Sequence, residues 1–266
     1  MHARLSRSML RAVSLPLERP APPSPWRALA LTAALALVGS GCIAANPLLS
    51  GGETTPRGRA DIALGGAARL PTGKLRSVPA IRGDQALQRS ALGEGMTPLV
   101  LARYGLNRHT DVELIVLGAS ARVSYRHEWL LADGINRTVW LISPSLLLGK
   151  AYDRESSPAR GGLRGTVELP FLYSADYGGV YETWVGPRVG ANYVMGDFST
   201  ASGVSDVRAT GLHAGAVLGF GAGFRRIHAM IELSALYEHW WLSANGERRQ
   251  RGGVVLMPAF ALRVRL

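Results

Sequence analysis

The sequence has little cysteine, lysine or charge, and no long apolar run beyond its N-terminal region. Its single cysteine, Cys42, excludes a disulfide-stabilised scaffold. Only two of the 30 basic residues are lysines, Lys74 and Lys150, and charged residues make up 18% of the chain. That share is below the roughly 25% of ordinary globular domains. A charge-rich disordered chain, a coiled coil and an ordinary transmembrane helix after the N-terminus are therefore excluded.

The N-terminus has the pattern of an export signal. Five arginines precede an uncharged segment, Ala28–Val38, and small residues lead to Cys42. This order predicts a cleaved signal peptide whose start is Met1 or Met9. Cys42 resembles the lipidated cysteine of bacterial lipoproteins, although Gly39 stands where that family prefers leucine. The alternative is cleavage after Ala44 or Ala45 with no lipid.

The mature chain alternates between apolar and other residues. Leu212, Leu218 and Phe220 share one parity, whereas the other parity of 211–223 is rich in glycine. Alternate side chains of a strand point to opposite faces, so each segment has one apolar face. Ten strands are predicted, over residues 58–70, 98–105, 110–117, 120–130, 137–150, 164–174, 179–195, 209–224, 227–242 and 253–266. Several reach the roughly 9–11 residues that a membrane-crossing strand needs.

The predicted connections differ between the two ends of the strands. One set is short: 106–109, 131–136, 175–178 and 225–226. The other set is mostly long and polar: 71–97, 151–163, 196–208 and 243–252. Short periplasmic turns and long outer loops are typical of transmembrane barrels. The predicted fold is all-β, an antiparallel up-and-down transmembrane β-barrel of about ten strands (8–12). The predicted divisions are a lipoprotein-type signal peptide (1–41), a flexible tether (42–57) and the barrel (58–266), whose first strand lies somewhere within 58–82.

Aromatic residues on the apolar parity collect near the predicted strand ends. Amphipathic rings favour the boundary between membrane and water. The predicted interface girdle comprises Tyr104, Trp129, Trp140, Tyr173, Tyr181, Phe224 and, at the outer end, Trp241.

Charged residues fall on the opposite parity and therefore point into the predicted lumen. The predicted network comprises Arg103, Glu113, Arg122, Arg126, Glu128, Glu168, Glu182, Arg188, Glu232, Arg263 and Arg265. Paired charges avoid the cost of isolated buried ones, which predicts a plugged lumen. The alternative is a narrow polar conduit, because the glycines of 211–223 leave free volume. An added hydroxyl in Gly219→Ser is expected to be mild.

Two segments resemble a known class of proteins. Arg103-Tyr104-Gly105-Leu106-Asn107-Arg108, followed by Asp111-Val112-Glu113-Leu114, resembles a hairpin frequent in small outer-membrane β-barrel proteins of double-membraned bacteria. The terminal strand resembles the signal read by the barrel-assembly machinery, although Leu266 stands where the class usually has phenylalanine. The resemblance covers about 98–266. It implies an outer-membrane location, with outer-membrane lipid, lipopolysaccharide and the assembly machinery as partners.

The sequence shows no motif for catalysis. His228, Glu232 and Ser234 share one strand face, but His228 and Glu232 lie about 13 Å apart along it, beyond hydrogen-bond reach. The chain is therefore predicted not to be an enzyme and to hold no metal or cofactor. The net charge of +11 is not assigned to nucleic acid, because the arginines are scattered and the chain is exported.

Three functions stay open at this point. The first is a plugged outer-membrane barrel with a structural or envelope-interaction role. The second is a narrow, porin-like channel for small polar solutes or ions. The third is a lipoprotein carrying a soluble, ligand-binding β-barrel. The predicted loop 243–252 is either a solvated tip or, through Arg248, Arg249 and Arg251, a site for lipopolysaccharide phosphates.

Overall fold

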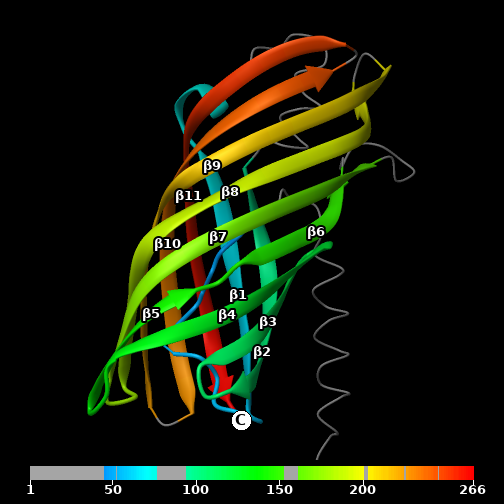
Figure 1. Cartoon of the computed structure of the whole chain (residues 1–266). Helices are drawn as coiled ribbons and strands as arrows, with labels where there is room; N and C mark the ends of the chain where they lie inside the picture. The colour runs from blue at the N-terminus through cyan, green and yellow to red at the C-terminus, as the bar shows by residue number, and fades with distance from the viewer. Residues whose placement is uncertain are drawn as a thin grey trace, which may run out of the picture.

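The chain folds into a closed antiparallel β-barrel (Figure 1). The computed structural model describes residues 45–51, 53–76, 94–152, 161–200, 203–224, 226–244 and 246–266. The strands are β1 (Ala60–Pro71), β2 (Gly95–Asn107), β3 (Thr110–Leu117), β4 (Ser120–Ala132), β5 (Asn136–Ile142), β6 (Ser145–Tyr152), β7 (Gly161–Tyr177), β8 (Tyr181–Thr200), β9 (Gly203–Phe224), β10 (Ile227–Ala244) and β11 (Glu247–Arg265). The ring closes because β3 pairs with β4 and β1 with β11. The predicted fold class is thereby confirmed, whereas the predicted signal peptide and Cys42 lie outside the described residues.

One predicted strand, 137–150, is interrupted in the middle. β5 ends at Ile142 and β6 begins at Ser145, and both lie between β4 and β7, so the ring has ten strand positions. The interruption falls at Pro144, which has no backbone N–H for the sheet. The backbone N–H of Tyr125 donates to the Pro144 carbonyl at 3.0 Å, so the interrupted strand stays attached to β4.

The two ends of the barrel differ in height. The C-terminal rim is the lower end in Figure 1, where the N–H of Leu266 donates to the carbonyl of Ala60 at 2.9 Å. At the opposite end, the far rim, β8 to β11 continue well beyond their neighbours (Figure 1). The predicted outer loops 196–208 and 243–252 are therefore wrong, because strand pairing continues through Asp197 with Asp206 and Ser243 with Arg248. Asp206 and Arg208 are exposed on the outer face there and Phe198 and Val207 are buried on the inner face, so the alternation is the reverse of that in a lipid-facing strand, but backbone pairing does not depend on it.

The segment before β1 lies inside the barrel. The sequence predicts a flexible tether over 42–57, but Ala45, Leu48 and Leu49 are at most 1% exposed and belong to an apolar cluster with lumen-facing side chains. Its next residues run to the C-terminal rim, where Arg57 bridges to Gly105. We call residues 45–57 the plug segment. The sequence pattern misses it because its backbone, rather than a row of alternating side chains, makes most of its polar contacts.

The barrel has an apolar exterior and a polar interior. Leu218 is 62% exposed and Ile231 is 60% exposed on the outside, whereas arginines and carboxylates are buried inside. A soluble barrel would place these two surfaces the other way round. A one-turn 3-10 helix, Gly73–Leu75, is the helical element of the described ranges, and none of their helices is long and apolar enough to cross a membrane.

Candidate functional site

The lumen brings together the charged residues that the sequence assigns to it. Ten of the eleven predicted side chains are at most 4% exposed: Arg103, Glu113, Arg122, Arg126, Glu128, Glu168, Glu182, Arg188, Glu232 and Arg263. The side chain of the eleventh, Arg265, is 26% exposed and lies close to the C-terminus. Their burial follows from the alternation of the strands that carry them.

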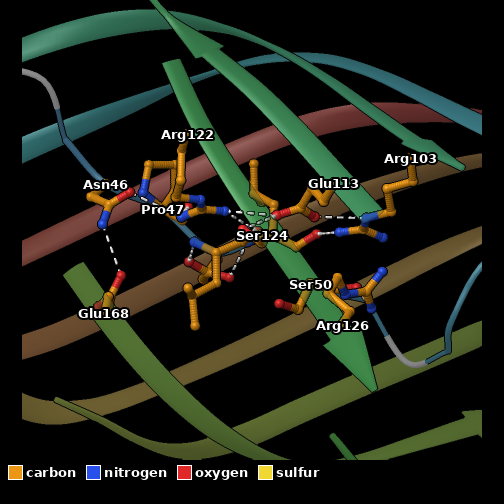
Figure 2. Close-up of polar contacts among 12 residues, drawn as sticks. Asn46, Pro47, Ser50, Arg103, Glu113, Arg122, Ser124, Arg126 and Glu168 are labelled. Carbon is orange, nitrogen blue, oxygen red and sulfur yellow. Dashed lines mark hydrogen bonds and ion pairs between the residues drawn. The ribbon is translucent and has the colours of Figure 1, made fainter. Parts of the chain in front are cut away.

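Glu113 is the centre of one cluster. Its two carboxylate oxygens accept hydrogen bonds from Arg103 Nε at 2.7 Å and Arg122 Nη2 at 2.9 Å, as Figure 2 shows. The hydroxyl of Ser124 donates to the same carboxylate at 3.4 Å. The three strands involved, β2, β3 and β4, are consecutive in the sheet, so neighbouring strands supply opposite charges to one point.

Glu168 of β7 is the centre of a second cluster. Arg188 Nε donates to it at 2.6 Å, and His213 Nε2 lies 3.3 Å from the same oxygen. Arg188 also donates through Nη1 to the Ser234 hydroxyl at 2.7 Å. Arg188 of β8 thereby links β7 to β10, which lies two strands away from it in the sheet.

The remaining predicted charges pair in ways that the sequence does not specify. Glu182 accepts from Arg263 Nη2 at 2.6 Å. Arg126 pairs with Asp111 at 3.0 Å rather than with a glutamate. Glu128 and Glu232 have partners outside the predicted network. Glu128 pairs with Arg137, which the sequence analysis does not select, and Glu232 binds the plug segment and Trp184.

Four lumen arginines donate to backbone carbonyls of the plug segment. Arg122 contacts the carbonyls of Pro47 and Leu48, the latter at 3.2 Å, and Arg188 donates to the Asn46 carbonyl at 2.7 Å. Arg103 donates to the Leu49 carbonyl at 2.5 Å. Arg126 donates to the carbonyls of Ser50 at 2.6 Å and Glu53 at 3.1 Å. Figure 2 shows the labelled Asn46, Pro47 and Ser50 among these arginines.

Three lumen carboxylates accept from backbone N–H groups of the same segment. The N–H groups of Leu48 and Leu49 donate to the two oxygens of Glu232 at 2.7 and 2.6 Å. The N–H of Thr54 donates to Glu128 at 3.0 Å, and that of Thr55 donates to Asp111 at 2.6 Å. Hydrogen bonds to ionised groups are stronger than those between neutral groups. The segment is therefore held by opposite charges on both sides of its backbone.

Two tryptophans occupy the space beside the lumen glycines. Trp184 and Trp240 are fully buried, and their indole N–H groups donate to Glu232 at 3.0 Å and Glu238 at 2.7 Å. A Cβ on Gly219 would overlap the ring of Trp184, and one on Gly211 would lie 2.7 Å from that of Trp240. The free volume assumed for a conduit is thus filled, and Gly219→Ser is not expected to be mild. Glycines on β9 opposite tryptophans on β8 and β10 are the sequence signal that could have revealed this.

The predicted girdle residues lie on the outside of the barrel. Tyr104, Trp129, Tyr173, Tyr181, Phe224 and Trp241 are between 38% and 70% exposed, and Trp140 is half-buried. Trp129 pairs in register with Trp140, and Trp140 with Tyr173, so three rings form one row across β4, β5 and β7. This row lies near the C-terminal rim, whereas Trp241 lies near the far rim.

Near the far rim, basic side chains border a recess of about 530 Å³. In register, Ser243 of β10 lies between Arg208 of β9 and Arg248 of β11. Trp241, two residues away on the same face, lines the same recess. A guanidinium row just beyond an aromatic ring at the edge of an apolar surface has the chemistry to bind an anionic headgroup.

At the C-terminal rim a smaller cavity of about 210 Å³ opens beside the end of the plug segment. Glu53 and Arg265 are among the residues that line it. Burial raises the pKa of Glu53 above its ordinary value of 4.5, although the Arg137 guanidinium 3.1 Å away acts in the opposite direction. Glu53 is the one carboxylate of residues 45–57.

Comparison with known proteins gives likenesses to solved structures and none to a family or curated sequence. No protein-family model and no curated protein matches the chain. Among solved structures, the outer membrane protease OmpT from Escherichia coli matches with a TM-score of 0.39 and 7% sequence identity. The match covers 78% of this chain and 96% of that chain.

The neighbour's description as a protease contradicts the prediction that this chain is not an enzyme, and we drop that prediction. A likeness at this TM-score and identity does not itself assign an activity to the chain. Within the described ranges, no group of three or more histidine, cysteine, aspartate or glutamate residues is arranged to hold a metal ion.

Proposed function

We propose that this protein is an integral β-barrel of the bacterial outer membrane whose lumen is closed by its own plug segment. The observation that carries the proposal is the burial of Asn46, Leu48 and Leu49 among the central lumen charges. A barrel of about this size leaves room for side chains and little else. Here a length of main chain fills that room as well.

The exterior supports the membrane part of the proposal. The outward side chains of the strands are large and apolar, and they include Leu218, Phe220, Ile231, Leu233 and Leu262, each at least 40% exposed. Continuous exposed apolar surface is rare on soluble monomers. A lipid-facing band bordered by aromatic rings accounts for it. The rival soluble, ligand-binding barrel leaves this surface in water, and its lumen has no room for a ligand while the plug segment is in place.

The proposed role is structural or envelope-interacting rather than conductive. We propose that the recess around Arg208, Ser243 and Arg248 faces the outer leaflet and binds phosphate groups of lipopolysaccharide. The terminal strand β11, with its alternating apolar residues, is the proposed contact for the barrel-assembly machinery. Export by the N-terminal signal and lipidation at Cys42 remain proposals drawn from the sequence.

Conductance and fractionation test the two parts separately. The protein is expected to stay with membranes through a carbonate wash, and release without detergent would contradict the integral barrel. Wild-type protein in planar bilayers is expected to show no steady conductance. The double variant Arg122→Gln and Glu232→Gln removes charge from both sides of the plug segment and is expected to show transient openings. Steady ion flow through the wild-type barrel would support the narrow-channel function instead.

A further inference from the structure

The lumen contacts the plug segment in the way that a peptide-binding protein contacts its ligand. Six consecutive or nearly consecutive carbonyls, from Asn46 to Glu53, accept hydrogen bonds from arginines that are fixed on the strands. Four N–H groups, from Leu48 to Thr55, donate to strand carboxylates. These groups are common to every polypeptide.

The lumen also reads side chains at one end of the segment. Asn46 donates through its amide to Glu168 at 2.8 Å and accepts from Arg122 at 3.0 Å. Leu48 and Leu49 are buried in an apolar cluster. An asparagine anchor and two leucines set the register, while the backbone supplies the remaining polar contacts.

The covalent link between the plug segment and the barrel is short and exposed. Arg57, Gly58 and Arg59 are all exposed, and Gly58 has a φ of +73° with no atom within 4 Å of the position a Cβ would take. The residues of the plug segment that contact the lumen precede this turn. Their partners lie on strands that are distant in sequence. The contacts therefore need the segment itself rather than its connection to β1.

We propose that the barrel lumen is a binding site for a polypeptide of the Asn-Pro-Leu-Leu type, whose main chain turns at Leu49 (φ +44°) and Gly51 (φ +63°), and that the plug segment is its resident ligand. The proposal deepens the proposed function and rests on it only in taking the closed barrel as the resting state. A buried array of opposed charges is costly unless each charge has a partner. The main chain of the plug segment supplies both donors and acceptors to such an array, and these peptide groups carry no net charge.

Cleavage at the exposed turn tests the proposal in the folded protein. A protease site is inserted between Gly58 and Arg59 in the full chain, which also carries Cys42→Ser so that no lipid can hold the released fragment. After cleavage in detergent, the N-terminal fragment is expected to co-elute with the barrel on gel filtration and to be detected by mass spectrometry. Immediate loss of the fragment from a barrel that stays folded would overturn the proposal, as would unfolding upon cleavage.

Rebinding then identifies the contacts. The fragment is removed in mild denaturant, and a labelled peptide of residues 45–57 is added back and followed by fluorescence anisotropy. The native peptide is expected to bind saturably at one site. A peptide N-methylated at Leu48 and Leu49 loses both donors to Glu232 and is expected to bind at least about tenfold more weakly, since hydrogen bonds to charged groups contribute strongly. Equal binding of the two peptides, or no rebinding of the native one, would overturn the proposal.

A matched pair of lumen variants completes the test. Glu232→Gln is expected to weaken peptide binding about tenfold or more. Glu238→Gln removes a similarly buried carboxylate whose partners are Arg69 and Trp240, and it should leave binding unchanged. Equal weakening by both variants would mean that the total charge of the lumen, rather than direct contact with Glu232, determines peptide binding. A wild-type barrel that conducts but binds the peptide would contradict the closed resting state alone, whereas a closed barrel that fails to rebind it would contradict only this inference.

Discussion

The indole ring of Trp184 lies directly against Gly219 on the neighbouring strand, in the place that any larger residue at 219 would need. The same indole donates its N–H to Glu232, which in turn accepts from two backbone groups of the plug segment. Because Gly219 on β9 has no side chain, the indole of Trp184 on β8 has room to donate to Glu232. Glu232 is the carboxylate that binds the plug segment.

Gly219→Ser is expected to destabilise the barrel by about 1–3 kcal/mol, because an inserted side chain must displace a packed ring. The midpoint of urea unfolding in lipid bilayers measures the change. Gly165→Ala is the control, since a Cβ there would meet only Leu148 at an ordinary 3.7 Å. Equal stability of Gly219→Ser and the wild type would mean that Trp184 is free to move aside.

The alternation of apolar and other side chains along the sequence predicts most of the fold. It predicted β3 at its observed bounds, β4 and β10 to within two residues, the C-terminal end of β9, and the inward parity of the charged residues. These features were accessible because each strand has one face in an apolar medium and one face in a crowded polar interior, which forces a period of two. The pairing of Arg103 with Glu113 follows from their opposed positions on adjacent strands.

The positions of the plug segment, Trp184 and Trp240 could not be predicted from this alternation. Most polar contacts of the plug segment are made by backbone groups, and backbone groups carry no sequence signal. Trp184 and Trp240 are apolar residues on the polar parity, so a rule that assigns apolar side chains to lipid places them outside. The long hairpins at the far rim were missed for a third reason: there the outer face carries polar residues such as Asp206 and Arg208, whereas Phe198 and Val207 are buried on the inner face, so the alternation is the reverse of that in a lipid-facing strand.

Leu218→Arg tests which face of β9 meets lipid. Leu218 is 62% exposed on the outer surface, and an arginine near the middle of a bilayer costs roughly 2–4 kcal/mol. The loss should be seen as a lower folded fraction in bilayers. Leu218→Phe keeps the position apolar and should fold like the wild type. Undiminished folding of Leu218→Arg in bilayers would indicate that this surface meets water.

Arg126→Ala tests the buried ion pairs. Arg126 is fully buried, pairs with Asp111 at 3.0 Å and donates to two plug carbonyls. Its removal leaves a buried carboxylate short of a partner, and a loss of about 3–5 kcal/mol in unfolding free energy is expected. Arg108→Ala removes an exposed arginine that lies 3.7 Å from Asp133 and should cost about 0–1 kcal/mol. Similar small losses in both variants would indicate a wet lumen in which water replaces the arginine.

Glu53 gives the plug segment a pH dependence of defined sign. Burial raises the pKa of this carboxyl group above 4.5, so the folded barrel holds its proton more tightly than the unfolded chain does. The stabilising contribution is full below the ordinary value of 4.5 and is lost as the pH rises through the raised pKa. Glu53→Gln stays neutral and should remove this part of the decline in the unfolding midpoint as the pH rises above 4.5. Asp133→Asn, which removes an exposed carboxylate, is the control, and its unfolding midpoint should vary with pH as that of the wild type does. A wild-type midpoint that instead rises with pH relative to Glu53→Gln would show that the ion pair with Arg137 outweighs burial.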